Sequence, residues 1–517
     1  MANKKLFSSL KNKMIPATDA RNEEGAPAYG LSPEAALAQY AATGCLNTTY
    51  YAAADEQLGL VLQLAEQVET DFLARVAVYS REQGNMKDMP ALLCAVLSVK
   101  DQKTLARIFH RVMDNGRMLR NFVQILRSGA AGRKSLGTGP KRLVREWLEY
   151  RGEEALFKAS VGNDPSLADV VKMVHPKPKT KIREAFYGYL VGREFDPELL
   201  PDLVRHYEKF KQDLSGPMPD VPFEMLTALE LGPREWKEIA RNAGWQMTRM
   251  NLNTFIRHGV FTDQEMVRLV AQRLGDREAI KKARVFPYQL LIAYKSAGPE
   301  LPQEIRESLQ EAMETATENV PAIAGQVYVC PDVSGSMSSP ITGRRRGSTS
   351  AVRCIDVAAL AAASILRQNP QAQVLPFEND VVNLSLNPRD SIMTNADKLA
   401  GVGGGGTNCS APLTRLNKQK AKGELVVFIS DNESWVDAGV GRGTQTMHQW
   451  NHFQKRNPQA RLVCIDIQPY RTTQAQERED IMNIGGFSDQ VFGVISLFAA
   501  GRLGSGHWLE KIKMVEI

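Results

Sequence analysis

The sequence is poor in cysteine and lacks any pair of cysteines at the spacing of a zinc site. Its six cysteines are scattered along 517 residues, and two of them lie in apolar runs. They are Cys45, Cys94, Cys330, Cys354, Cys409 and Cys464. We therefore expect reduced, buried thiols and a cytoplasmic protein rather than a disulfide framework.

Long hydrophobic runs are also missing. The longest uncharged apolar stretch, around residues 491–500, is about half as long as a membrane-spanning helix. The first ten residues contain no extended apolar region. These features predict neither export nor membrane insertion, and we expect a monomer.

The composition lacks any strong overall charge bias. The net charge is +6, with 43% hydrophobic and 24% charged residues, which is typical of a folded soluble protein. A chain of this length exceeds what one hydrophobic core usually supports. The periodicity changes near residue 321, so we predict a helical domain over 1–321 and an α/β domain over 322–517.

The second domain alternates short apolar runs with helical patterns, which is typical of a mostly parallel, doubly wound sheet. Strands are predicted at 326–330, 373–377, 381–386, 425–429 and 461–467, and helices at 354–367, 391–400 and 444–456. Ligands of such sheets bind beyond the carboxyl ends of the strands.

Oxygen-bearing side chains follow two of these strands. Asp332, Ser334 and Ser336 form an Asp-x-Ser-x-Ser loop, and Asp431 follows the strand at 425–429. Thr407 comes directly after four glycines that bring no side chains of their own. Hard oxygen ligands favour Mg²⁺, so we predict a divalent cation, most plausibly Mg²⁺, held by these five residues.

This order of residues resembles the metal-ion-dependent adhesion site of von Willebrand factor A domains. The resemblance implies Mg²⁺ held by hydroxyls and aspartates, with one position open for an acidic group of a partner. Two alternatives stay open: a Ser- and Gly-rich loop capped by aspartates, and a Mg²⁺-dependent phosphatase or nuclease. The glycines at 403–406 do not form a nucleotide loop, because no Gly-Lys-Ser/Thr follows them.

The first domain has helical periodicity from about residue 32 to 313 and no strand-like alternation. Pairs of helical segments separated by Gly- or Asp-rich turns predict stacked hairpins of the HEAT type. No strict repeat consensus is visible, so a plain globular helical domain remains an alternative.

Acidic residues are absent between Asn115 and Arg145, although the surrounding chain is rich in Lys and Arg. Residues 103–183 contain 18 Lys and Arg against 7 Asp and Glu. Phosphate backbones are the usual partner of such a bias, whereas the simpler interpretation is a solvated charged face. The candidate residues for contact with such a polyanion are Lys141, Arg142, Arg145, Lys177, Lys179 and Lys181, and His175 begins the second basic cluster.

Several segments in order along the chain resemble the TROVE family of Ro autoantigen proteins. They are residues 141–147, 169–178, 252–257, 283–293, 332–337, 405–412 and 431–433. One departure is the stretch 338–352, which contains Arg344, Arg345 and Arg346 and is longer than usual. The resemblance implies a ring of HEAT-like helices joined to a von Willebrand factor A domain.

The same resemblance implies a non-catalytic RNA-binding scaffold. Its expected partners are Y RNA and other non-coding RNAs on a basic outer surface, single-stranded 3′ ends of misfolded or decaying RNA, and a 3′-to-5′ exoribonuclease. By that match, Lys141, Arg142 and His175 correspond to RNA-contacting positions. The alternative function is a metal-dependent protein-adhesion module presented on a helical scaffold.

Overall fold

The computed structural model describes most of the chain. The described residues are 15–43, 46–283, 287–318, 320, 322–344, 352–435, 443–468, 470–485, 489–501 and 507–517. Cys45, Arg345 and Arg346, and residues 284–286 of one resembling segment, lie outside them. Within these ranges, every helix is too short or too polar to cross a membrane.

The chain forms two compact units. The first consists of Met1–Leu64, Ala271–Pro299 and Gln303–Lys513, and the second of Ala65–Val270, Glu300–Pro302 and Met514–Ile517. Residues 1–64 thus belong to the same unit as the parallel sheet, whereas the sequence pattern drew a single boundary at 321–322.

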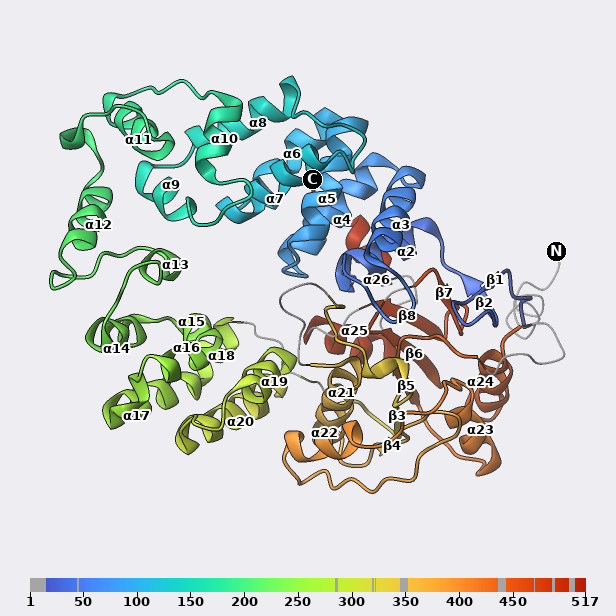
Figure 1. Ribbon diagram of the computed structural model, residues 1–517. Coiled ribbons are helices and arrows are strands. Elements are labelled where there is room, and N and C mark those ends of the chain that lie inside the picture. The colour runs from blue at the N-terminus through green and yellow to red at the C-terminus, as the bar shows by residue number, and fades with distance from the viewer. Residues whose placement is uncertain are drawn as a thin grey trace. The chain divides into compact units, whose positions relative to one another are not determined.

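A parallel sheet of five strands, in the described part of the first unit, has the order β4-β3-β5-β6-β8 (Figure 1). Its strands are β3 (Val327–Pro331), β4 (Gln373–Val374), β5 (Leu425–Ser430), β6 (Arg461–Asp466) and β8 (Ile481–Gly485). Every residue of β3 and β5 is buried, as their continuous apolar runs require in a sheet covered on both faces. The predicted doubly wound α/β fold is confirmed.

Helices cover the two faces of this sheet. The helices that follow β3 along the described chain are α21 (Cys354–Gln368), α22 (Ile392–Ala400), α23 (Ala411–Lys418), α24 (Gln445–Arg456), α25 (Asp489–Ala499) and α26 (His507–Lys513). Alternate strand residues such as Cys330, Phe428 and Cys464 form one core with Trp450 and Phe453 of α24. The helix α21 packs against β3, β4 and β5, and α22 packs against α21.

The predicted strand at 381–386 is wrong. Val381 makes an isolated antiparallel bridge with Phe377, and the chain after it has no regular structure. Asn383 uses its side-chain oxygen to accept a hydrogen bond from Arg415 at 2.8 Å. The Val382 amide donates to the Pro376 carbonyl at 2.8 Å, so the segment turns back on the chain before it instead of joining the sheet.

The amino-terminal segment completes the first unit. The strands β1 (Ala20–Arg21) and β2 (Pro27–Gly30) pair with each other, and β2 also pairs antiparallel with β7 (Thr472–Thr473). Tyr29 of β2 lies in the core of the parallel sheet. The helix α2 (Pro33–Thr43) packs against β8 and α26. This unit also contains α18 (Arg277–Ala283), α19 (Pro287–Ser296) and α20 (Gln303–Thr317).

The second unit is helical. Its stack begins with α4 (Thr70–Glu82), α5 (Asp88–Lys100), α6 (Gln102–Val112), α7 (Gly116–Ser128), α8 (Thr138–Glu149), α9 (Glu153–Ala159), α10 (Leu167–Val174) and α11 (Lys181–Val191). It continues with α12 (Asp202–Gln212), α13 (Phe223–Leu226), α14 (Pro233–Asn242), α15 (Trp245–Met250) and α16 (Leu252–Arg257). The helices α3 (Ala54–Gln67) and α17 (Gln264–Leu274) run across the unit boundaries.

Neighbouring helices of the second unit form stacked hairpins. The helix α4 packs on α5 and α6, α5 on α6 and α7, and α6 on α8. The helix α7 packs on α9 and α10, and α10 packs on α11. Each helix therefore contacts its hairpin partner and the next hairpin, as in a HEAT-like stack, which confirms the predicted fold class.

Candidate metal centre and nucleic-acid interface

The metal loop, residues 332–337, begins where β3 ends. The Asp332 amide donates to the Ile429 carbonyl at 2.9 Å, which fixes the loop to β5. One Asp332 carboxylate oxygen accepts from the Ser334 amide at 2.8 Å, and the other accepts from the Ser430 hydroxyl at 2.5 Å. This carboxylate is fully buried and held in one orientation.

The remaining donors of the metal loop converge on Asp431. The Ser334 and Ser336 hydroxyl oxygens are 3.2 Å apart. Ser336 also forms a side-chain hydrogen bond with Asp431, which lies at the carboxyl end of β5. Adjacent parallel strands therefore bring Asp332, Ser334, Ser336 and Asp431 together, although about one hundred residues of sequence separate the two aspartates.

Thr407 reaches this region through the glycines that precede it. The Gly335 amide donates to the Gly405 carbonyl at 2.8 Å, so the glycine stretch packs directly on the metal loop. Gly403 has a φ of +88°, and a Cβ there would collide with the carbonyl oxygen of Val333. Thr407 is buried, and its carbonyl accepts from the Trp435 amide at 3.1 Å. Glycine is needed at position 403 for this close approach.

Burial strongly affects the carboxyl groups around this loop. Burial, followed by the nearby Asp332 carboxylate, raises the pKa of Asp431 to about 7. Burial also raises the pKa of Asp332, while hydrogen bonds from Ser334 and Ser430 oppose that shift. Burial and Asp431 raise the pKa of Glu433 to about 9, and the same two causes raise the pKa of Asp466. Several carboxyl groups are therefore concentrated here, and burial together with their mutual repulsion disfavours the charged forms.

The donor set suits a hard divalent cation. Among the described residues, no three His, Cys, Asp or Glu side chains are grouped to hold a metal ion, so an ion here would depend on hydroxyl ligands as well as carboxylates. Neither Asp332 nor Asp431 forms an ion pair with a described Lys or Arg, and a bound cation would stabilise both carboxylates. Two carboxylates and hydroxyl oxygens match the preference of Mg²⁺, and the residues present fit the ion.

Two residues near the metal loop were not identified from the sequence. Ser430 directly precedes Asp431 at the end of an apolar strand. A hydroxyl at that position could have indicated a further polar side chain beside the metal loop. Tyr51 forms side-chain hydrogen bonds with Ser336 and Glu24, and its ring packs edge-on against Tyr470. No local pattern links Tyr51 to a loop nearly 300 residues later in the chain.

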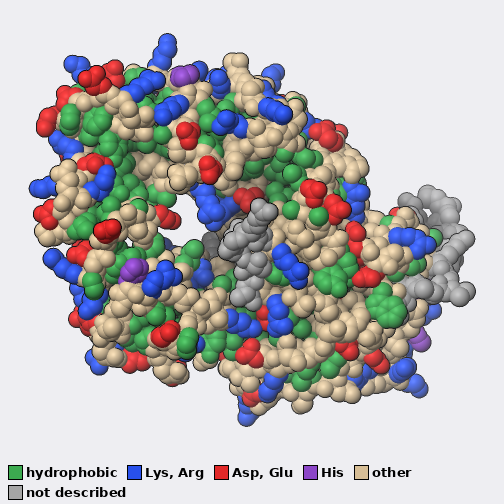
Figure 2. Space-filling view, viewed as in Figure 1, with side chains coloured by type: hydrophobic (Ala, Val, Ile, Leu, Met, Phe, Trp, Pro, Cys, Tyr) green, Lys and Arg blue, Asp and Glu red, His purple; other side chains and the backbone are tan. Residues whose placement is uncertain are grey.

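The two basic segments of the sequence meet at one place in the helical unit. Lys141, Arg142 and Arg145 lie on α8, and Arg145 donates through Nε to the Val174 carbonyl at 2.5 Å. Val174 is the last residue of α10, and His175 follows it. The structure thus brings together the seven candidate residues, called here the basic surface. Figure 2 shows Lys and Arg side chains and a histidine over α8, α10 and α11.

The members of the basic surface differ in their ion pairs. Lys179 pairs with Glu149 at 2.7 Å, and Arg142 pairs with Glu146 at 3.6 Å. In the part of the chain that the structure describes, Lys141, Lys177 and Lys181 form no ion pair with a carboxylate. Lys177 and Lys181 are exposed, and Lys141 is half-buried. These three ammonium groups remain available for an anionic partner.

The segment that carries His175 is held by a helix cap. The Ser166 hydroxyl accepts from the Asp169 amide at 3.0 Å, and the Asp169 carboxylate accepts from the Ser166 amide at 3.0 Å. This capping box starts α10, and His175 ends it in the left-handed conformation with a φ of 50°. The His175 side chain is exposed, so the sharp turn presents it to solvent.

An exposed aromatic residue beside the basic surface was not identified from the sequence. Tyr150 follows α8 directly and is 79% exposed. Its ring packs edge-on against His110 at 5.5 Å between centroids. Exposed aromatic rings next to cationic side chains are suited to stacking on unpaired bases. The signal in the sequence was a tyrosine immediately after a basic helix.

Two family models match this chain. The model described as the Ro60 vWA domain matches residues 326–499, and the model described as the TROVE domain matches residues 225–332. The first covers the parallel sheet with the metal loop, the glycine stretch and Asp431. The second covers the last part of the helical unit and the chain that leads into β3.

The similar proteins match either nearly the whole chain or about half of it. "RNA-binding protein RO60" of Deinococcus radiodurans is 25% identical over 95% of this chain and 97% of that protein. "RNA-binding protein RO60" of Caenorhabditis elegans is 23% identical over 47% of this chain and 38% of that protein. A crystal structure of the Deinococcus radiodurans RO (RSR) protein covers 91% of this chain and all of that one, with a TM-score of 0.62 and 22% identity, which shows the shared fold. The chain is therefore similar over nearly its whole length to a bacterial RO60 protein, and it contains matches to the TROVE domain and to the Ro60 vWA domain.

Proposed function

We propose that this protein is a non-catalytic RNA-binding scaffold that holds structured RNA on the basic surface. The observation that carries the proposal is the hydrogen bond from Arg145 to the Val174 carbonyl, which joins the basic residues of α8 to those after α10. Lys141, Lys177 and Lys181 then offer positive charge that no described carboxylate neutralises. Phosphate groups release bound counterions when such side chains replace them.

The names of the similar proteins support this proposal. Proteins from a bacterium and a nematode that are similar to this chain are both named RNA-binding protein RO60. By the family resemblance, we propose Y RNA as the ligand of the basic surface, and single-stranded 3′ ends of misfolded or decaying RNA as further ligands of the helical unit. The protein would act in the cytoplasm in RNA quality control and degradation, together with a 3′-to-5′ exoribonuclease.

The metal centre has a supporting role in this proposal. Asp332, Ser334, Ser336, Thr407 and Asp431 would hold Mg²⁺, which supplies a positive charge that an acidic group of a partner can bind. Ser430 and the Ser334 amide orient the Asp332 carboxylate, and the glycine stretch packs on the loop. No residue here is assigned a catalytic role.

Purifying the protein from its own cells and sequencing the bound RNA tests this function. We expect small structured RNAs, and changing Lys141, Arg142 and His175 together to Ala should release them and reduce the salt dependence of binding. A variant that retains the same RNA with the same salt dependence would contradict the proposal.

A second candidate is a metal-dependent protein-adhesion module. The grouping of Asp332, Ser334, Ser336 and Asp431 at the end of the sheet supports this candidate, because that geometry does not involve the basic surface. Purified protein that carries no nucleic acid, and that captures an acidic protein partner only when Mg²⁺ is present, would support this candidate over RNA binding.

A further inference from the structure

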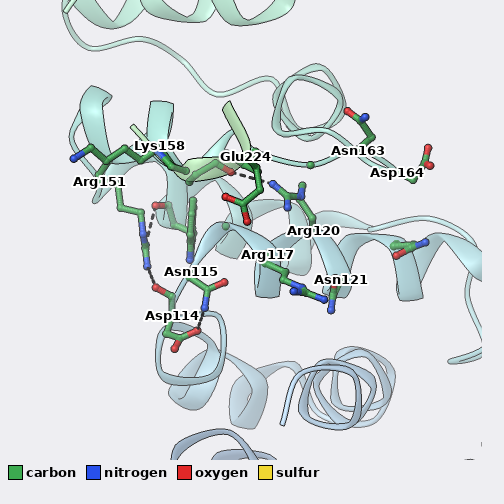
Figure 3. Close-up of a pocket in the computed structure, with 18 residues that line it drawn as sticks. Asp114, Asn115, Arg117, Arg120, Asn121, Arg151, Lys158, Asn163, Asp164 and Glu224 are labelled. Atoms are coloured by element: carbon green, nitrogen blue, oxygen red, sulfur yellow. Dashed lines mark hydrogen bonds between the residues drawn. The ribbon is translucent and has the colours of Figure 1, made fainter. Parts of the chain in front are cut away.

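A pocket of about 760 Å³ opens within the helical unit (Figure 3). It lies between the start of α7, the end of α8, the helix α9 and the loop that leads to α10, and α13 reaches its margin. Its volume is within the usual range of small-molecule sites. None of the seven residues of the basic surface lines it. The pocket is therefore a separate feature of this unit.

Four cationic side chains line the pocket. Figure 3 shows Arg117 and Arg120 on α7, with Arg120 extending upward and Arg117 downward beside Asn121, and Arg151 and Lys158 on the other side of the view. Lys158 pairs with Asp220 at 2.7 Å. Within the described residues, Arg117, Arg120 and Arg151 have no carboxylate oxygen within the 4.0 Å of an ion pair. Three guanidinium groups thus line one cavity without a described ion-pair partner, and the nearby Asp114 carboxylate partly offsets the positive charge around Arg151.

Two of these guanidinium groups are fixed in position. Arg120 donates through Nη1 to the Ala159 carbonyl at 3.0 Å, and it passes close beneath Gly162. Gly162 has a φ of +101°, and a Cβ there would lie 2.5 Å from an Arg120 nitrogen. Arg151 stacks on the Trp147 ring at 3.6 Å. Fixed guanidinium groups lose little side-chain entropy when they bind an anion.

The electrostatic environment confirms an excess of positive charge. Burial and the neighbouring Arg117 lower the pKa of Arg120. Burial, Arg117 and Arg81 lower the pKa of Lys87, which lies nearby on the chain before α5. The amino end of α7 also borders the pocket and adds the positive end of a helix dipole. An anion would relieve this repulsion.

Acidic residues restrict the kind of anion that fits. Asp114 is occupied by Arg81 at 2.7 Å, but Asp164 and Glu224 form no ion pair with any described cation. Their carboxylates would repel a second phosphate and would accept hydrogen bonds from hydroxyl groups. Asn115 and Asn163 add carboxamides to the same lining. A ligand with one phosphate and a hydroxyl-rich remainder matches this division of charge.

We propose that this pocket binds a phosphate monoester on a hydroxyl-bearing group, with Arg117, Arg120 and Arg151 holding the dianionic phosphate. The ester would belong to a free mononucleotide or to the terminal phosphate of an RNA strand. Guanidinium groups recognise phosphate through paired hydrogen bonds, and three of them favour a dianion over the single charge of a phosphodiester. The proposal does not depend on RNA binding at the basic surface.

Calorimetric titration of the full-length protein, freed of nucleic acid, tests this site. The probes are AMP, adenosine, and a tetranucleotide with either a 5′-phosphate or a 5′-hydroxyl. We expect AMP to bind at least about tenfold more tightly than adenosine, because charged hydrogen bonds of this kind each contribute about tenfold or more. Binding by the phosphorylated tetranucleotide alone would identify the terminal phosphate of an RNA strand as the ligand. Binding by AMP alone would identify a free mononucleotide as the ligand.

Arg117→Gln is the informative variant, because the Arg117 side chain is exposed and holds no other part of the fold. It should weaken binding of the phosphorylated probe by about tenfold. The matched control is Arg127→Gln, which removes the same charge from an exposed position in the last turn of α7, outside the pocket. Lys141→Gln should also leave AMP binding unchanged.

Two results would overturn the proposal. In one, neither phosphorylated probe binds more tightly than its unphosphorylated counterpart. In the other, Arg127→Gln weakens binding as much as Arg117→Gln, which would indicate general surface charge. Loss of RNA binding in Lys141→Gln with intact AMP binding would separate the two sites.

Discussion

Lys179 and Lys181 allow a direct test of how the basic surface binds RNA. The two residues are exposed and only two positions apart, but Lys179 pairs with Glu149 at 2.7 Å whereas Lys181 has no described acidic partner. Changing either residue to Gln removes one charge and preserves helix-forming tendency. We expect Lys181→Gln to weaken RNA binding clearly and Lys179→Gln to weaken it little.

The expected magnitudes follow from counterion release. One phosphate contact contributes about 0.7 to 0.9 to the magnitude of the slope of log affinity against log salt. Relative to a reference of about 1 M salt, this contribution is worth about fivefold in affinity at 0.15 M. Lys181→Gln should therefore weaken binding about fivefold. RNA must compete with Glu149 for Lys179, and breaking an exposed ion pair costs up to about 1 kcal/mol. This cost offsets most of what Lys179 gains from a phosphate contact, so Lys179→Gln should change RNA affinity by about twofold or less.

Filter binding or fluorescence anisotropy between 0.05 and 0.3 M salt, over which the Debye length falls from about 14 to about 6 Å, measures both the affinity and its salt dependence. Changing Lys141, Lys177 and Lys181 together should reduce the slope by about 2.4 and the affinity at 0.15 M by about 100-fold. Equal effects of Lys179→Gln and Lys181→Gln would refute the argument from ion pairs. An unchanged slope in the triple variant would refute the placement of RNA on this surface.

Three further predictions concern the metal centre and the helix caps. Mg²⁺ should raise the melting temperature of the wild-type protein over an EDTA control but not that of Asp332→Asn, and an equal rise in both would place the ion elsewhere. Ser166→Ala should cost about 1 kcal/mol in urea unfolding at pH 7. Because the Ser166 hydrogen bonds lower the pKa of Asp169, the part of this stabilisation that depends on the Asp169 carboxylate is present above the ordinary pKa of Asp and is lost as pH falls through the lowered one. The difference in stability between the two proteins should therefore shrink in acid, and a constant difference would contradict this contribution. Gly403→Ala should lower the free energy of unfolding more than its control Gly404→Ala, for which backbone strain alone should cost roughly 1–3 kcal/mol. Both glycines have a positive φ, but a Cβ at position 404 meets no atom within 4 Å, whereas one at position 403 collides with the Val333 carbonyl oxygen.

The sheet and the metal donors could be predicted because their signals are local. Continuous apolar runs identify β3 and β5, and parallel pairing places their carboxyl ends side by side. Asp332 and Asp431 follow those strands directly, so their proximity follows from the fold class. The same reasoning failed at residues 381–386, where Val381 pairs only with Phe377 and no adjacent strand supplies a ladder.

Contacts between distant segments could not be predicted from the sequence. The ion pair of Lys179 depends on Glu149, which lies 30 residues earlier on another helix, and no local pattern relates them. Tyr51 approaches Ser336 only because the amino-terminal segment packs on the unit that contains the sheet. The pocket beside α7 likewise combines residues from separate helices, and its charge pattern appears only after they are packed.

The pairing of β2 with β7 has a consequence for protein synthesis. Gly30 ends β2 and Thr472 begins β7, so 472 − 30 gives an interval of 442 residues. At about 5–20 residues per second, a ribosome needs roughly 20 to 90 s to produce that interval. During this time the stack of helices can fold on the nascent chain, while Tyr29 and its strand stay without their core. Newly made protein therefore passes through a stage with an open strand edge, which chaperones bind readily.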